Sequence, residues 1–136
     1  MKIIYIISIP LITAFLLLFT GKLKVLRETL SLLLSGLFFG CILPLYGHTA
    51  VFSLKFISFK LNFALNPLSW FFLFTISFFT FLTAIYSAVL DFKKDSLGWF
   101  HFSFFIKVFS MTAIVLASDL LAFFIFWEIM SLFTYF

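Results

Sequence analysis

Long apolar runs joined by short polar links dominate the chain. Because a bilayer core about 30 Å thick needs roughly 20 apolar residues per helix, runs of this length indicate membrane-spanning helices. They cover residues 3–20, 29–47, 68–90, 97–117 and 120–136. Asp119, in the tight turn before the last run, is placed to cap it. The pattern predicts an all-α integral membrane protein with five transmembrane helices in a single domain, residues 1–136.

Two features bear on how the first helix lies in the membrane. The run after Met1 and Lys2 could be a cleaved signal peptide, but its length favours an anchored helix, as does the lack of a small-x-small cleavage site in FLLLFTGKLKV. The basic residues of the links fall on two sides, Lys22, Lys24, Arg27, Lys93 and Lys94 against Lys2, Lys55 and Lys60. Since positively charged links stay in the cytoplasm, we expect the N-terminus outside, in a multi-pass protein of the cell (inner) membrane.

Residues 50–66, AVFSLKFISFKLNFALN, follow a different pattern. Apolar residues occupy even positions from Phe52 to Phe56 and odd positions from Ile57 to Leu65. Alternation with a slip in phase predicts two short extended stretches with a kink, lying on the outer surface between the second and third helices. A plain amphipathic loop fits the same residues equally well. A strand-like edge here could pair with a neighbouring subunit.

Composition narrows the classes of function. The chain is 65% hydrophobic and 10% charged, whereas soluble domains are about 45–50% apolar and about 25% charged. Its net charge of +4 comes from nine scattered basic residues, which suit membrane topology better than a nucleic-acid surface. Cys41 is the only cysteine, so no internal disulfide or thiolate metal site is supported. With no phosphate loop, histidine cluster or nucleophile elbow in the sequence, we expect no catalytic residues, cofactor or metal.

Polar side chains recur in three successive helices at spacings that place them on one face. The sets are Thr80, Thr83 and Ser87 in the third helix, Ser103, Lys107 and Ser110 in the fourth, and Glu128, Ser131 and Tyr135 in the fifth. Hydroxyl groups in helices usually bond their own backbone, so the set in the third helix is interpreted as structural. In the second helix, small residues at four-residue spacing predict close packing against a neighbour. They are Ser31, Ser35, Gly36 and Gly40.

Glu128 is an acidic residue near the middle of the predicted fifth transmembrane helix. An acid at a helix centre costs about 2.5–3.5 kcal/mol on an insertion scale, and each Leu, Ile or Phe returns about 0.3–0.6 kcal/mol. Ten of the last seventeen residues are Leu, Ile or Phe, so the helix inserts despite the acid. Ionisable groups inside a membrane usually face a protein interior or a water-filled path and mark ion routes. Glu128 is therefore the leading candidate for a proton or ion pathway.

Lys107 and His101 are the other ionisable candidates. Counted from the turn at residues 118–119, Lys107 lies about eleven residues back and Glu128 about nine or ten forward, which at about 1.5 Å per residue gives depths about 3 Å apart. The two could form an ion pair, or Lys107 could extend its stem toward the cytoplasm. His101, one turn inside the cytoplasmic end, could relay protons or serve as an interfacial polar anchor.

One segment resembles a known family. The stretch DLLAFFIFWEIMSLFTYF is similar to the fifth helix of the antiporter-like subunits. These subunits occur in respiratory complex I, in Mrp-type sodium/proton antiporters and in membrane-bound energy-converting hydrogenases. The segment LNPLSWFFLF at the start of the third helix and an outside N-terminus agree with that family. The pattern FFxFWExMSLxxYF carries most of the resemblance, and the rest is shared hydropathy.

The resemblance implies a fourteen-helix transporter with two inverted repeats, the first beginning at the fourth helix. In that family a glutamate of the fifth helix faces a buried lysine of the seventh, and modulating the pair is thought to drive protons along a hydrated axis. By the motif, Glu128 takes the place of that glutamate. The chain corresponds to about the first third of a family member, without the helices that carry the partner lysines. The family pattern has no lysine at the position of Lys107.

We therefore expect a membrane subunit that contributes part of a proton or Na⁺/H⁺ pathway in a redox-driven pump or an Mrp-type antiporter. Its partners would be other membrane subunits and the lipid bilayer, without nucleic acid. It could be half of a split subunit whose remaining helices form a separate chain, a degenerate copy with Lys107 as counter-charge, or a shortened chain. The rival functions are a non-conducting structural subunit and a small homo-oligomeric channel with Glu128 around its pore.

Overall fold

The computed structural model describes residues 2–20, 23–47, 49–89 and 97–135. Its elements are the helices α1 (Lys2–Phe19), α2 (Lys24–Ile42), α3 (Pro67–Val89), α4 (Leu97–Leu116) and α5 (Leu120–Tyr135), the 3₁₀ turn η1 (Leu43–Leu45), and the strands β1 (Ala50–Phe56) and β2 (Phe59–Leu65). The five helices lie in the apolar runs, as predicted. Three stretches are long and apolar enough to cross a membrane, namely Val25–Leu45, Pro67–Val89 and Trp99–Leu116.

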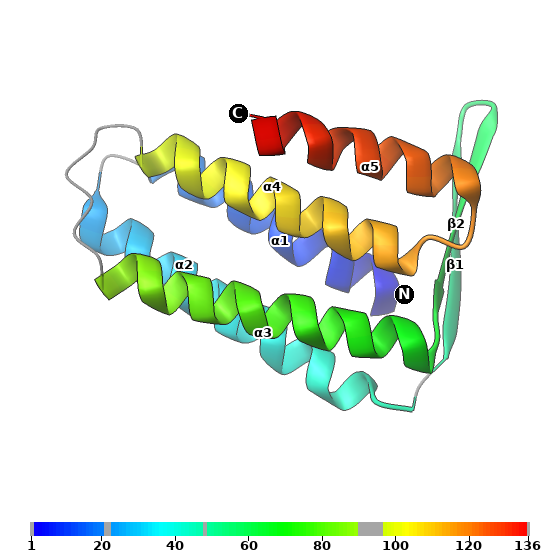
Figure 1. Cartoon of the computed structure of the whole chain (residues 1–136), viewed down its shortest axis with the longest axis horizontal. Coiled ribbons are helices and arrows are strands. Elements are labelled where there is room, and N and C mark those ends of the chain that lie inside the picture. The colour runs from blue at the N-terminus through cyan, green and yellow to red at the C-terminus, as the bar shows by residue number, and fades with distance from the viewer. Residues whose placement is uncertain (1, 21–22, 48, 90–96, 136) are drawn as a thin grey trace.

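Helices α1 to α4 form an antiparallel bundle, and α5 lies outside it (Figure 1). Within the bundle, α1 packs on α2 and α4, and α3 packs on the same two helices. Helix α5 packs along α4 and touches β2. The N-terminal end of α1, the β1–β2 hairpin and the link between α4 and α5 all lie at one end of the molecule (Figure 1). One side of α5 is therefore covered by the bundle and the opposite side is open.

The start of α2 corrects a prediction. The helix begins at Lys24 instead of residue 29, so Arg27 lies inside it and is buried rather than in a cytoplasmic link. Leu26, Arg27 and Glu28 favour helix, and no breaker separates them from the apolar run. The Thr29 hydroxyl donates to the Val25 carbonyl at 2.8 Å, within the helix. The predicted basic residues Lys22, Lys93 and Lys94 lie outside the described residues.

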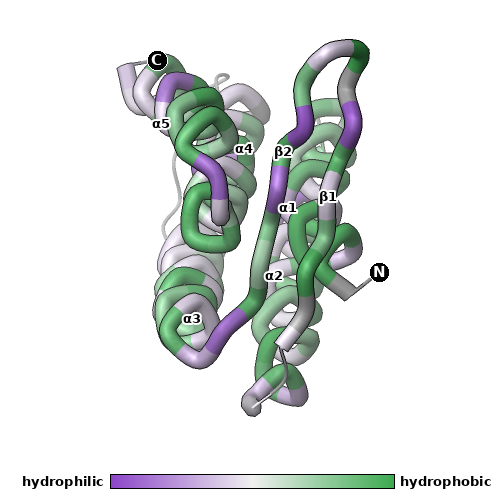
Figure 2. The backbone as a smooth tube through the Cα atoms, turned by 90° about the vertical axis from the view of Figure 1, so that its right-hand side faces the viewer, coloured by the Kyte–Doolittle hydropathy of each residue, from purple (hydrophilic) through white to green (hydrophobic). Residues whose placement is uncertain are grey.

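The segment between η1 and α3 is an antiparallel hairpin, which confirms the two predicted extended stretches. Phe52 pairs with Phe63 and Leu54 with Leu61. Even positions of β1 therefore oppose odd positions of β2, so the slip in phase is what brings both apolar sets to one face. Ile57, in the two-residue turn, has a φ of 52°. The hairpin lies across the ends of the helices (Figure 2).

Strand β2 fixes the hairpin to the bundle. Phe63 and Leu65 are 1% and 2% exposed and belong to the main apolar core. The backbone N–H of Ser118, between α4 and α5, donates to the Asn62 carbonyl at 3.0 Å. An isolated bridge pairs Phe63 with Ala117. Through these contacts, β2 holds the point at which α5 begins.

The start of α3 is fixed by side-chain hydrogen bonds. The Asn66 side-chain oxygen accepts the Ser69 N–H at 2.9 Å, so Asn66 caps the helix, with Pro67 at its first position. The Ser69 hydroxyl donates to the Val115 carbonyl of α4 at 3.2 Å. The Trp70 indole N–H donates to the Ile42 carbonyl of α2 at 2.9 Å. These bonds connect α3 to both of its neighbours at the hairpin end.

The small residues of α2 divide between two faces. Ser31 and Ser35 are buried toward the bundle, as the packing interpretation predicts. A Cβ added at Gly36 would lie 3.5 Å from the Phe81 ring of α3, an ordinary contact distance, and one at Gly40 would meet nothing within 4 Å. The serines, rather than the glycine pair, therefore let α2 pack closely on the bundle.

Candidate functional site

Helix α5 turns an aromatic face toward α4. Phe126 contacts Phe109, with ring centroids 5.6 Å apart, and Phe133 contacts Phe102 at 5.9 Å. Ala122, one turn before Phe126, is fully buried. Residues at this spacing share one face of a helix. The rotation of α5 about its axis is thus set by this apolar line.

The predicted polar line of α5 lies on its open side. Glu128 and Ser131 are exposed, and Tyr135 is 88% exposed. The three residues share the i, i+3, i+7 spacing, roughly opposite the face that meets α4. The face also carries large apolar side chains, with Phe124 55% exposed. An acid therefore lies on a largely apolar helix surface that no described part of the chain covers.

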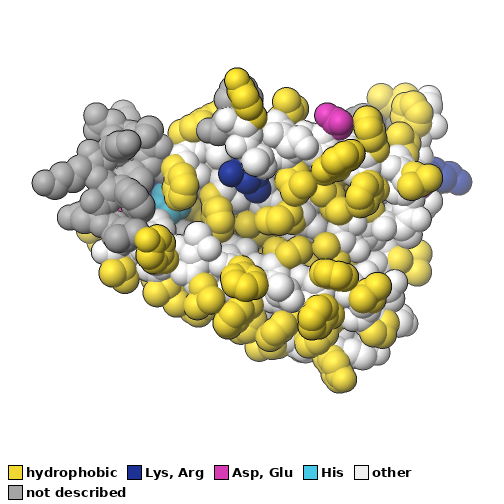
Figure 3. All heavy atoms as spheres, viewed as in Figure 1, with side chains coloured by type: hydrophobic (Ala, Val, Ile, Leu, Met, Phe, Trp, Pro, Cys, Tyr) yellow, Lys and Arg dark blue, Asp and Glu magenta, His cyan; other side chains and the backbone are white. Residues whose placement is uncertain are grey.

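Lys107 does not meet Glu128 in the part of the chain that the structure describes. Lys107 is half-buried on α4, and neither side chain makes a salt bridge or hydrogen bond among these residues. The reason is the rotation of α5, which directs its aromatic line at α4 and its carboxylate away. In Figure 3, a Lys or Arg side chain lies among apolar side chains over the middle of the bundle.

The two serines of the same α4 line are buried. Ser110 is fully buried, and its hydroxyl donates to the Ile106 carbonyl at 3.0 Å. Ser103 is 5% exposed, and its hydroxyl has no hydrogen-bond partner among the described residues. Lys107, between them in sequence, keeps part of its surface open. Helix α4 therefore places a lysine at the boundary between covered and open surface.

His101 and Arg27 are charged or ionisable side chains that lie inside the bundle. Each is 3% exposed, and the guanidinium of Arg27 is close enough to act electrostatically on the His101 imidazole. His101 also makes an edge contact with the Phe100 ring, with centroids 5.6 Å apart. His101 is therefore enclosed by the bundle near the start of α4. Any proton exchange at His101 would take place beside a fixed positive charge.

The sequence pattern predicts a link at Arg27, so it does not indicate that this residue is buried in a helix. A signal was present, since Arg27, Ser31 and Ser35 follow one another at four-residue spacing. Such spacing places all three on one face of a helix. Their burial, at 3%, 2% and 0% exposure, shows that this is the inner face of α2. Helix α2 thus has a line of polar residues on one face, as α3, α4 and α5 do.

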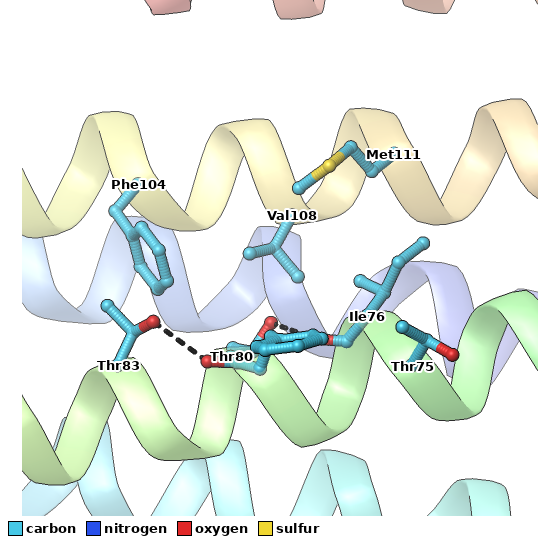
Figure 4. A pocket seen from close by; sticks show the side chains of 8 residues that line it. Thr75, Ile76, Thr80, Thr83, Phe104, Val108 and Met111 are labelled. Carbon is cyan, nitrogen blue, oxygen red and sulfur yellow. Dashed lines mark hydrogen bonds between the residues drawn. The ribbon is translucent and has the colours of Figure 1, made fainter.

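Two of the three hydroxyls in the α3 line bond their own helix, as predicted. Thr80 and Thr83 donate to the carbonyls four residues earlier, Ile76 and Phe79, at 2.7 and 2.8 Å (Figure 4). Ser87, the third member of the line, is buried at 6% exposure. Hydroxyl groups satisfied in this way add little polarity to a surface. These residues are structural, and part of the line borders a cleft between α3 and α4.

Glu128 and His101 therefore lie in two separate environments. Glu128 is exposed on the open face of α5. His101 is enclosed in the bundle beside Arg27. No family model matches the chain, and no curated protein matches it.

Proposed function

We propose that this chain is a membrane subunit that contributes part of a proton or Na⁺/H⁺ translocation pathway in a multi-subunit complex. The complex would be a redox-driven pump or a cation/proton antiporter, in which the five helices span the membrane with the N-terminus outside. The observation that carries the proposal is the position of Glu128, an acid on the open face of an apolar helix. An acid in that position requires a partner in the membrane.

The resemblance to antiporter-like subunits supports the same residue. The proposal gives Glu128 the role of the family's fifth-helix glutamate, opposite a basic residue on a helix of a partner subunit. A positive charge that approaches a carboxylate favours its ionised form, and one that retreats favours the protonated form. Movement of the partner charge would therefore load and unload a proton at Glu128. Ser131 and Tyr135, on the same face, would hydrogen-bond water or the partner helix.

The test is Glu128→Gln in the assembled complex, which keeps the side-chain volume and removes the titration. We expect unchanged assembly, with ion translocation per complex below about one hundredth of wild type, the lower end of what a positioned proton-transfer group contributes. The matched control is Glu28→Gln, because Glu28 is a half-buried acid on α2, a helix that does not border α5. Normal translocation in the Glu128→Gln complex would contradict the proposal.

The alternative is a non-conducting structural or assembly subunit. The observation that favours it is that Glu128 and Lys107 do not meet in the described part of the chain, so the chain brings together no charged pair of its own at the open face. In that case Glu128 would serve as a fixed salt-bridge partner. The same Glu128→Gln variant would then reduce the amount of assembled complex and leave translocation per complex intact.

A further inference from the structure

A cleft opens between α3 and α4. Its volume is about 210 Å³. The α4 wall is formed by Phe104, Val108 and Met111, whose side chains are drawn above the cleft in Figure 4. The α3 wall is lined by Thr75, Ile76, Phe79, Thr80 and Thr83. The cleft is therefore formed by side chains of two neighbouring helices near the middle of their length.

The polar groups that line the cleft already have hydrogen-bond partners, so an apolar occupant would leave none of them unsatisfied. The hydroxyls of Thr75, Thr80 and Thr83 donate to carbonyls of their own helix at 3.0, 2.7 and 2.8 Å. The other lining side chains are apolar. A ridge of apolar side chains on a further helix would fill such a groove, since helices in membranes associate chiefly through close packing.

Lys107 lies at the α4 edge of this cleft. It is three residues from Phe104 and four from Met111, so the three side chains are neighbours on the helix surface. Lys107 is half-buried, and no described carboxylate makes a salt bridge with it. A lysine in that position within a membrane needs a counter-charge, a water-filled path or access to the interface.

The position of Lys107 along α4 argues against access to the interface. It is the eleventh of twenty residues in the helix Leu97–Leu116. At about 1.5 Å per residue, either helix end is about 14 Å away along the axis, well beyond the reach of a four-carbon stem. Snorkelling would leave the ammonium group inside the hydrocarbon region. A counter-charge at the same depth meets the requirement.

We propose that this cleft and Lys107 form the docking surface for a transmembrane helix of a partner subunit that carries a carboxylate near its midpoint. The apolar ridge of that helix fills the cleft, and its acid pairs with Lys107. A lipid chain would fill the cleft but would bring no charge to Lys107. This surface goes beyond the proposed function, because it involves α3 and α4 instead of the open face of α5.

The experiment places a photo-crosslinking benzoylphenylalanine at Phe104 in the full chain, expressed in its native membrane. The matched control carries the same group at Leu37, which is 59% exposed on α2. Mass spectrometry then identifies the peptide bound to each probe. We expect the Phe104 probe to capture an apolar segment of another membrane protein that contains Asp or Glu. The Leu37 probe is expected to capture lipid.

Variants that remove or keep the positive charge at Lys107 distinguish specific docking of a helix from chance contact with the probe. Lys107→Met should lower the Phe104 adduct about tenfold or more, because loss of one partner of a desolvated ion pair weakens binding at least that much. Lys107→Arg should retain the adduct, and Glu128→Gln should leave it unchanged, which keeps this test independent of the proposed function. Adducts to lipid alone, to a second copy of this chain, or to a segment without an acid would overturn the proposal. So would an adduct that persists in Lys107→Met.

Discussion

At the scale of single residues, the position of a charged side chain decides what it can do in a membrane. Glu128 is exposed on α5, whereas Arg27 is 3% exposed inside the bundle. An exposed acid in an apolar helix calls for a partner from outside the chain, and a buried guanidinium acts on what surrounds it within the chain. The effect of Arg27 on His101 is therefore a property of the folded bundle.

Asn66 allows a residue-scale test of the fold. Its side-chain oxygen accepts the Ser69 N–H at the start of α3, so Asn66→Ala should lower the free energy of unfolding by about 1 kcal/mol. Asn66→Asp should keep most of the stability because a carboxylate also accepts this bond. The control is Asn62→Ala, because the Asn62 side chain makes no hydrogen bond within the described residues. Thermal unfolding in detergent micelles, followed by circular dichroism, measures the difference, and equal midpoints for the two alanine variants would contradict the capping role.

The sequence shows which polar residues share a helix face, but it does not show the direction in which that face points. The spacing of Glu128, Ser131 and Tyr135 establishes that they share a face of α5. Which way that face points depends on how Phe126 and Phe133 pack on α4, a tertiary contact that hydropathy does not record. The predicted alternative of a Lys107–Glu128 pair rested on depth alone, and depth does not determine rotation about a helix axis.

At the scale of elements, the helices could be predicted because apolar length is a local property. The β1–β2 hairpin could also be read from the sequence, since its slip in phase matches a two-residue turn. The start of α2 could not be placed by the same rule. Basic residues that resemble a cytoplasmic link are equally compatible with the first turn of a helix, and the burial of Arg27 depends on α2 packing within the bundle.

The turn of the hairpin carries a strained residue. Ile57 has a φ of 52° and is 97% exposed. The left-handed conformation costs a residue with a Cβ about 1–2 kcal/mol. Because Ile57 is exposed, side-chain packing does not offset this cost. Ile57→Asn should therefore stabilise the hairpin by about 1 kcal/mol, whereas Ile57→Val, which keeps the branched Cβ, should not. Slower amide exchange in β1 and β2 of the Asn variant alone is the expected result, and equal exchange in both variants would argue against strain at the turn.

At the scale of the whole molecule, the hairpin joins the four-helix bundle to the separate helix α5. Strand β2 bonds the α4–α5 link at Ser118, and Phe63 contacts the Phe126 ring of α5, with centroids 5.9 Å apart. Along its described length, α5 packs chiefly on α4, and β2 is the other main element that it contacts. The orientation of the Glu128 face therefore depends on two supports, the α4 contact and the hairpin. Neither support is visible in the hydropathy of α5 itself.

Removal of the Phe63 ring tests this coupling. Phe63 is 1% exposed, so Phe63→Ala should cost about 3–5 kcal/mol of stability through lost burial and a cavity. The control is Phe59→Ala on the same strand, where the ring is 61% exposed and the cost should stay within about 0.5 kcal/mol. Because Phe63 supports the start of α5, amide exchange in lipid nanodiscs should rise most in β2 and the first turns of α5, while α2 and α3 remain protected. A uniform rise across all helices, or an unchanged α5, would mean that the hairpin covers the bundle without holding the Glu128 helix in place.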